Sequence, residues 1–233
     1  MNNVWDMFHV KPSDFQKQQF EKYYELLIEW NKKVNLTSIV DREDVWIKHF
    51  VDSCSLLDWY SVESMSGKTL IDIGTGAGFP GIPLAIMCPD LSITLLDSLN
   101  KRVQFLEIVK QELGLSNITT IHGRAEDYGK DKTFREQYDF AVSRAVSNLS
   151  SLLEYCIPFV KVNGLFVSYK SVRAVDELIN AANSMSILKC KVKEERKLKL
   201  PDESDRSLLI FSKYEITPDK YPRKAGMPTK RPL

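Results

Sequence analysis

A glycine-rich loop lies between two short apolar runs that each carry an aspartate at or near their end. Gly74, Gly76 and Gly78 alternate along the loop, Asp72 stands two residues before the first of them, and Asp97 closes the second run. Glycines let a backbone turn tightly and approach a ligand where a Cβ atom would clash. A carboxylate about 20 residues beyond such a loop is placed to accept both ribose hydroxyls of a nucleoside. The spacing therefore predicts a nucleoside-binding crevice that contains these three glycines and Asp97.

The residues around the loop indicate which nucleoside binds. Gly76–Gly81 matches the dinucleotide signature G-x-G-x-x-G, which aims the amides of a helix N-terminus at a pyrophosphate. Pro80 and Pro83 remove two such amides, and Asp72 adds negative charge where phosphates would lie. S-adenosylmethionine (SAM) has no phosphate but has a sulfonium and an ammonium group, which carboxylates suit better. We therefore expect SAM as the cofactor, rather than NAD or a loop that only turns the chain.

Two further segments are expected at the same crevice. Gly123–Asp127 follows the third predicted strand, where this type of fold commonly contacts the adenine. Glu126 is therefore a candidate acceptor for the exocyclic amine, and a surface turn is the alternative. Ser143 and Arg144 end the fourth predicted strand, beside the expected methyl group. Arg144 is a candidate for positioning SAM or the base, and a solvated charge at the rim is the alternative.

The end of the fourth strand also limits the acceptor chemistry. Methylation of an exocyclic base amine typically uses an N/D-P-P-Y/F segment, which Ser143–Val146 lacks. Methylation at C5 of a pyrimidine needs a cysteine nucleophile, and Cys156 falls on a predicted helix away from the strand ends. His9, His49 and His122 form no recognisable base constellation, so the catalytic residues stay unknown. A free lone pair, such as that of guanine N7, fits because alignment alone supplies up to about 7–11 kcal/mol.

Hydrophobic patterning predicts the elements that position these residues. Ser13–Gln16 reads as a capping box that opens a helix, and a second helix is expected from about Asp41. From Thr69 onward, short apolar runs alternate with helical stretches such as Lys101–Leu113, which is typical of a parallel sheet covered on both faces. Seven strands are expected, at residues 69–73, 93–96, 118–121, 140–143, 165–168, 188–200 and 207–214. A helix is expected around 172–185, and prolines and a glycine from Thr217 onward argue against regular structure there.

This pattern predicts an α/β protein with the Rossmann-like fold of class I SAM-dependent methyltransferases. The sheet is expected to be mostly parallel and seven-stranded, with an antiparallel last strand because only a short turn precedes it. Residues 1–66 form a predicted N-terminal helical extension packed on the core. Residues 67–216 form the predicted SAM-binding core, and residues 217–233 a basic tail.

Charge and cysteine use narrow the class further. Residues 189–233 carry 13 lysines and arginines against 7 aspartates and glutamates, whereas the rest of the chain is acidic. Such asymmetry suggests that a polyanion meets one end of the molecule. The four cysteines are far apart with no CxxC pair, so we expect free buried thiols and no metal site. No apolar run approaches the roughly 20 residues of a membrane span, and Met1–Val10 lacks the features of a secretory signal, which predicts a cytoplasmic protein.

Several dispersed segments resemble the RsmG (GidB) family of bacterial 16S ribosomal RNA guanine-N7 methyltransferases. The resemblance runs nearly end to end and includes 30–37, 49–53, 72–83, 96–102, 123–126, 143–145 and 221–226. It implies methylation of guanine N7 in 16S ribosomal RNA or the small ribosomal subunit. It also implies SAM contacts from Gly74, Phe79, Ala125, Glu126 and Arg144. Residues 168–171 depart from the family's usual Leu-Lys-Gly pattern, so no role is assigned to the lysine there, Lys170.

With this resemblance, the basic tail is interpreted as an RNA contact. A disordered basic terminus is the alternative. Phosphate contacts give affinity without base specificity. The candidate cations are Lys220, Arg223, Lys224, Lys230 and Arg231. Three rival functions remain open at this point: a SAM-dependent enzyme for a small molecule or protein, a nicotinamide dehydrogenase, and an RNA-binding module without catalysis.

Overall fold

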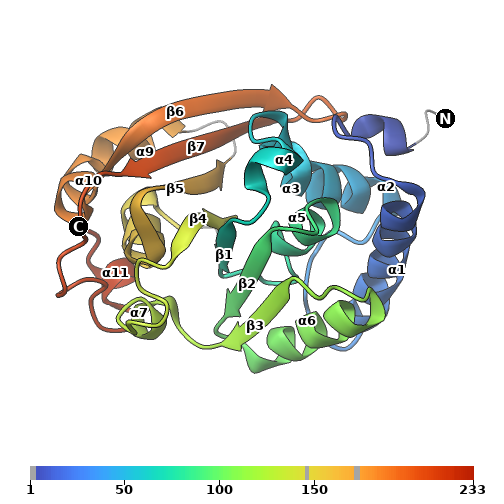
Figure 1. The fold of residues 1–233 in the computed structure, drawn as a ribbon, viewed down its shortest axis with the longest axis horizontal. Coiled ribbons are helices and arrows are strands. Elements are labelled where there is room, and N and C mark those ends of the chain that lie inside the picture. The colour runs from blue at the N-terminus through green and yellow to red at the C-terminus, as the bar shows by residue number, and fades with distance from the viewer. Residues whose placement is uncertain (1–3, 145–146, 171–173) are drawn as a thin grey trace.

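The computed structural model describes residues 4–144, 147–170 and 174–233, so Ala145 and the start of the helix predicted at 172–185 lie outside it. A seven-stranded sheet runs through the centre in the order β3-β2-β1-β4-β5-β7-β6 (Figure 1). β1 to β5 are parallel, and β7 runs antiparallel to both of its neighbours. The predicted sheet with its antiparallel last strand is therefore confirmed. The strands are β1 (Thr69–Ile73), β2 (Ser92–Asp97), β3 (Ile118–His122), β4 (Tyr138–Ser143), β5 (Val160–Lys170), β6 (Cys190–Lys199) and β7 (Asp205–Lys213).

One strand is much longer than its apolar run. Only residues 165–168 were expected as a strand, whereas β5 covers Val160–Lys170 and its first half includes polar residues. Asn163 adopts the left-handed conformation (φ 70°), which asparagine tolerates better than most residues. The register of β4 against β5 shifts between Tyr138 and Phe140, so the strand continues past this irregularity.

The first predicted helix is confirmed with its cap. In α1 (Asp14–Asn31) the Ser13 hydroxyl accepts from the Gln16 amide, and the Gln16 side chain accepts from the Ser13 amide. The second predicted helix is present but broken into short pieces of different pitch. These are α2 (Arg42–Val45), the π-helical η2 (Trp46–Val51), α3 (Asp52–Cys54) and η3 (Ser55–Asp58).

The remaining helices cover the two faces of the sheet. Alternate residues of β1 divide between two buried clusters: Leu70 packs with the N-terminal helices, α5 and α6, and Ile71 packs with α8 and η4. Figure 1 shows the N-terminal helices at one end of the molecule and the final segment of the chain at the other. These helices are η1 (Val4–Met7), α4 (Val62–Met65), α5 (Gly81–Met87), α6 (Asn100–Glu112), α7 (Ala125–Tyr128), α8 (Leu149–Cys156), η4 (Ile157–Phe159), α9 (Ala174–Asn180), α10 (Ala182–Leu188) and α11 (Met227–Lys230).

The tail differs from the prediction that prolines exclude regular structure after Thr217. One helical turn, α11, forms beside α8, because Pro228 occupies a position in the first turn where no backbone donor is needed. Thr217, Tyr221 and Pro228 are buried, so this segment is packed on the fold rather than loose. The predicted division at residues 66 and 216 stays a prediction.

Gly78 gives a first test of the loop. Its φ is +102°, and a Cβ there would lie 2.4 Å from the Ile82 side chain and 2.8 Å from the Tyr23 hydroxyl. We expect Gly78→Ala to lower the free energy of unfolding by about 2–3 kcal/mol through backbone strain and overpacking. Gly114→Ala is the matched control, because Gly114 also has positive φ (+63°) but open space around it, and should cost about 1 kcal/mol. Urea unfolding of both variants measures the difference; equal losses would contradict the packing argument.

Candidate cofactor site

A cavity of about 420 Å³ opens at the carboxyl ends of the central parallel strands. This is where open α/β sheets bind ligands, and its volume lies within the range of small-molecule sites. Of the predicted cofactor residues, Gly74, Asp97, Ala125 and Glu126 line it. The rest of the lining is Ile73, Leu96, Ser98, Leu99, Gly123, Arg124, Ser143, Ser147, Leu152, Tyr155 and Gly226.

The glycine loop has the conformation that its sequence predicts. Gly74, Gly76 and Gly78 all have positive φ, at 70°, 64° and 102°. The N–H of Gly74 donates to the Leu96 carbonyl over 2.9 Å, which ties the loop to the end of β2. Only Gly74 of the three lines the cavity; Gly76 donates its amide to Asp97, and Gly78 packs against Ile82 and Tyr23.

Asp97 holds the loop and still has acceptor capacity. Its side chain is 3% exposed. Oδ2 accepts from the Gly76 amide (2.9 Å), Oδ1 accepts from the Leu99 amide (2.9 Å), and Arg102 lies 3.5 Å from Oδ2. A carboxylate has about four acceptor positions, so roughly two remain for hydroxyl groups in the cavity. This arrangement fits a ribose whose two hydroxyls both donate to one side chain.

The start of α5 does not offer the free amides that a pyrophosphate needs. The Gly81 amide donates to Asp72 Oδ2 (2.9 Å), and the Ile82 amide donates to the Gly78 carbonyl (2.7 Å). Pro83 has no amide hydrogen, and the Leu84 amide donates to the Pro80 carbonyl. The missing amide donors that opposed a dinucleotide are therefore confirmed, whereas the Asp72 charge is buried away from the cavity.

Asp72 braces the loop from beneath and does not line the cavity. Its side chain is fully buried, and Oδ2 also accepts from the Thr75 hydroxyl over 2.7 Å. Oδ1 has no hydrogen-bond partner among the described residues. Burial raises the pKa of Asp72 to about 7, against the opposing effect of the Thr75 and Gly81 hydrogen bonds. A cation in the crevice would favour the ionised form of this carboxyl.

This raised pKa predicts a pH dependence of stability. The folded state holds the Asp72 proton more tightly than the unfolded chain, so this contribution is complete below about pH 4 and is lost as pH rises through 7. Between pH 6 and 8 we expect the cofactor-free protein to lose about 1.4 kcal/mol from this group. Urea unfolding at pH 6, 7 and 8 measures it. Asp72→Asn should remove that loss, and parallel pH profiles for variant and wild type would contradict the assignment.

Arg144 and Phe79, which were also predicted to contact SAM, are not among the residues that line the cavity, and both contact the N-terminal helices. The guanidinium of Arg144 lies 4.9 Å from the centre of the Phe79 ring, and the His49 ring stacks on the same ring at 4.4 Å. Arg144 donates to the Lys48 carbonyl (2.9 Å), to Asp52 Oδ2 (3.1 Å) and to His49 Nδ1 (3.0 Å). The side chain is 19% exposed, so it is held rather than solvated. The alternative of a solvated rim charge is therefore wrong.

His49 is a neutral part of this cluster. Burial lowers its pKa to about 3, and the charge of Arg144 acts in the same direction. The ring accepts from Arg144 at Nδ1, which leaves Nε2–H to donate to the Thr37 hydroxyl over 2.9 Å. Asn31 fixes Thr37 by accepting from its amide and donating to its carbonyl. His49, fixed through Thr37 and Asn31, thus holds Arg144 and Phe79 in place from the N-terminal helices.

Sequence reasoning assigned no role to these extension residues or to Asp52. Two features of the sequence could have identified them. They lie in segments 30–37 and 49–53, which resemble the family, and they are polar residues within an otherwise apolar pattern. Lys170 is also accounted for, because its ammonium donates to Glu177 (2.7 Å) and to the Ser147 carbonyl (3.0 Å), next to the cavity lining. Sequence reasoning also missed Tyr155 and Gly226, which reach the cavity from α8 and the tail.

Other candidate chemistry is absent from the described part of the chain. The four cysteines are free and buried there, and Cys156 is fully buried in α8, so it does not reach the crevice as a nucleophile. Within the described ranges, no group of three or more His, Cys, Asp or Glu side chains is placed to hold a metal ion. No described helix is long and apolar enough to cross a membrane.

The strand order with its antiparallel β7 is the fold of class I SAM-dependent methyltransferases. Solved structures with this fold include TYW2 from M. jannaschii in complex with AdoMet, with a TM-score of 0.52 at 14% identity over 71% of this chain and 76% of that one. A putative O-methyltransferase from Klebsiella pneumoniae has a TM-score of 0.56 at 14% identity over 88% and 92%. Identities this low show the fold alone.

Sequence comparison gives the family. The family model described as rRNA small subunit methyltransferase G matches residues 16–208. A ribosomal RNA small subunit methyltransferase G of Alkaliphilus metalliredigens is 49% identical, covering 97% of this chain and 93% of that protein. A protein of the same name from Streptococcus pneumoniae is 48% identical over 95% and 93%. The chain belongs to the rRNA small subunit methyltransferase G family.

Proposed function

We propose that this protein transfers the methyl group of SAM to N7 of one guanine in 16S ribosomal RNA, in the cytoplasm. The observation that carries the proposal is the family match over residues 16–208, which include every residue that lines the cavity except Gly226. SAM supplies an electrophilic methyl group when bound. Asp97 would accept from its ribose and Glu126 from its adenine amine, and Gly74 would let it approach the loop.

The end of β4 supports a lone-pair nucleophile. The Ser143 hydroxyl donates to the Ile73 carbonyl over 2.8 Å, so it is occupied in holding two strands together. His49 is already bonded on both ring nitrogens. Guanine N7 needs no deprotonation, so these residues need only align the base and exclude water. Arg144 directly follows this strand end, and an arginine suits the neighbouring O6 of guanine.

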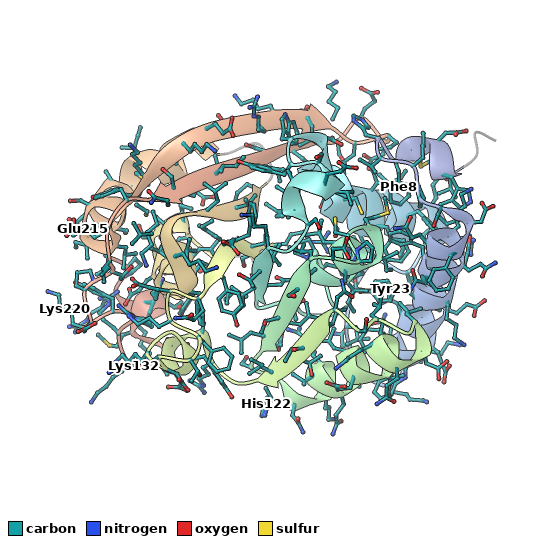
Figure 2. The ribbon with its side chains drawn as sticks, in the orientation of Figure 1. Phe8, Tyr23, His122, Lys132, Glu215 and Lys220 are labelled. Carbon is teal, nitrogen blue, oxygen red and sulfur yellow. The ribbon has the colours of Figure 1, made fainter. Side chains whose placement is uncertain are left out.

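The exposed cations of the tail are proposed contacts to RNA phosphates. Lys220, Lys224, Lys230 and Arg231 are exposed, and Figure 2 shows Lys220 pointing away from the fold. Arg223 was predicted to join them, but the structure places it against buried Glu154 instead. The proposal therefore keeps four of the five predicted cations.

Mapping the methyl group tests the function. Small ribosomal subunits from cells that lack this activity are incubated with the protein and labelled SAM, and the RNA is cleaved chemically at N7-methylguanine. We expect a single labelled guanine in 16S RNA. Label at another atom of the RNA, or only in protein or a small molecule, would overturn the proposal and favour the alternative SAM-dependent enzyme. Naked 16S RNA in parallel shows whether the assembled subunit is required.

Charge removal tests the RNA contact. Each of Lys224→Ala, Lys230→Ala and Arg231→Ala should weaken RNA binding similarly for all sequences and lower the slope of log affinity against log salt by about 1. Titrations at several salt concentrations measure the slope. Lys132→Ala is the control, since Lys132 is also exposed but lies in the loop before β4. Unchanged slopes for the three tail variants would place the RNA elsewhere.

A further inference from the structure

The segment from Thr217 to Leu233 crosses the outer side of α7 and α8 and ends beside α10 (Figure 1). We propose that this segment is a strap that positions Glu126 and closes the adenine end of the cofactor crevice, with the Arg223–Glu154 pair as its anchor. The inference rests on SAM binding as described above and assigns the tail a role in cofactor affinity. Its exposed cations remain available to RNA on the opposite side.

The strap reaches the crevice at Gly226. The Gly226 amide donates to Glu126 Oε1 over 2.9 Å, and Gly226 itself lines the cavity. Its φ of +79° turns the backbone so that this amide faces inward, a conformation that glycine adopts without strain. Glu126 is 8% exposed, so a buried carboxylate here needs fixed donors. With Oε1 held by the strap, Oε2 is oriented for a second donor, such as an exocyclic amine.

The anchor is an ion pair with one fully buried partner. Glu154 on α8 is completely inaccessible to solvent, and its carboxylate accepts four hydrogen bonds from Arg223. The Arg223 amide and Nε donate to Oε1 (2.7 and 2.9 Å), while Nε and Nη2 donate to Oε2 (3.1 and 2.7 Å). Fork-like pairs of this kind fix geometry as well as charge. Arg223 therefore fixes the backbone only three residues before Gly226.

Hydrogen bonds to backbone carbonyls hold the strap on both sides of the anchor. Before it, Arg135 donates to the carbonyls of Thr217 and Tyr221. After it, the Ser151 hydroxyl donates to the Pro228 carbonyl over 2.7 Å. Buried contacts of this kind are expected of a segment that is packed permanently on the fold. An arm that becomes ordered only when RNA binds would not form them.

Besides the Gly226–Glu126 hydrogen bond, a residue of α8 also connects the strap to the cavity. The Tyr155 side chain lines the cavity, and its hydroxyl forms a 2.8 Å hydrogen bond with the Thr229 hydroxyl of the strap. Gly129, at the end of α7, is packed so closely against the strap that a Cβ there would lie 3.0 Å from Pro222. The strap thus contacts both helices that carry the lining residues Glu126 and Tyr155.

The test distinguishes the strap residue that pairs with the fold, Arg223, from the exposed strap residue next to it, Lys224. Arg223→Gln keeps a donor but removes the charge, and we expect it to raise the Kd and KM for SAM at least tenfold, with kcat at saturating SAM and RNA affinity within twofold of wild type. Lys224→Ala, one residue away and exposed, should do the opposite, lowering RNA affinity and leaving the SAM Kd unchanged. Calorimetry gives the SAM Kd, and thermal melting without SAM checks that both variants are folded.

The outcomes distinguish this inference from the proposed function. If wild type binds SAM and folded Arg223→Gln binds it within twofold as well, the strap is overturned and the function stands. If Arg223→Gln loses RNA affinity as Lys224→Ala does, Arg223 is an RNA contact and the strap is again overturned. If wild type does not bind SAM, both proposals fail.

A measurement on the wild type covers the case in which Arg223→Gln does not fold. Hydrogen–deuterium exchange with and without SAM should show slower exchange in the peptide that contains Gly226, because the cofactor holds Glu126 in place. Exchange in the β6–β7 turn, at Pro201–Ser204, is the internal control and should not change. Unchanged exchange at Gly226 on SAM binding would overturn the strap.

Discussion

Asp97→Ala should weaken SAM binding by about 1.5–3 kcal/mol, which is roughly 10- to 150-fold in Kd. The carboxylate is the acceptor at the end of β2 that the ribose would use, and its own contacts with Gly76 and Leu99 hold the glycine loop and the start of α6. The alanine variant therefore loses the hydroxyl contacts and loosens the wall that faces the ligand. Isothermal titration calorimetry with SAM measures the loss directly.

Two further variants sharpen this result. Asp97→Asn keeps one acceptor oxygen, so its loss should lie between wild type and alanine. Asp127→Ala is the matched control, because Asp127 is an exposed carboxylate on α7, beside Glu126, and should leave the SAM Kd within twofold. An Asp97→Ala affinity equal to that of the control would refute the ribose assignment.

Arg144→Gln should lower the free energy of unfolding by about 3 kcal/mol, the lower end for breaking a buried ion pair. The Asp52 side chain is 5% exposed, and burial already raises its pKa against the opposing charge of Arg144. Arg206 lies 3.5 Å from the other carboxylate oxygen and compensates in part. For a chain of this length, the loss corresponds to roughly 6–12 °C in Tm.

The pair can be tested as a unit. Arg144→Gln combined with Asp52→Asn removes the buried carboxylate and leaves only the partly exposed Arg206 without its partner, so we expect the double variant to recover most of the stability. Arg124→Gln is the control, since Arg124 is an exposed arginine, and its loss should leave the free energy of unfolding nearly unchanged. A double variant as unstable as Arg144→Gln would show that the loss comes from packing on Phe79 and not from charge.

The crevice shows how far local patterns reach. Gly74, Asp97 and Glu126 were predicted because each follows a strand whose apolar run is visible in the sequence, and parallel strands bring their carboxyl ends to one edge. His49 and Asp52 were not predicted, since their helices gave only an apolar stripe. Their contacts with Arg144 cross more than 90 residues of chain and depend on how the extension packs.

The tail is a second region where the sequence did not predict the role of a residue. Composition described it as basic and proline-rich, which predicted an RNA-binding arm. The sequence contains Arg223 and Glu154, but only packing brings a fully buried carboxylate within 2.7 Å of that cation. Burial then changes the role, because a charge pair that is desolvated is fixed to the fold, whereas an exposed lysine is free for a partner.

The sequence by itself determined the fold class through its alternating strands and helices, and the cofactor through the glycine loop with its aspartates, because these patterns are local. Only the tertiary structure determined the role of each carboxylate. Asp97 faces the cavity, Asp72 is buried beneath the loop, and Glu126 is held by Gly226 from 100 residues away. Hydrogen bonding and desolvation depend on every atom around a group, and those neighbours come together only when the chain is folded.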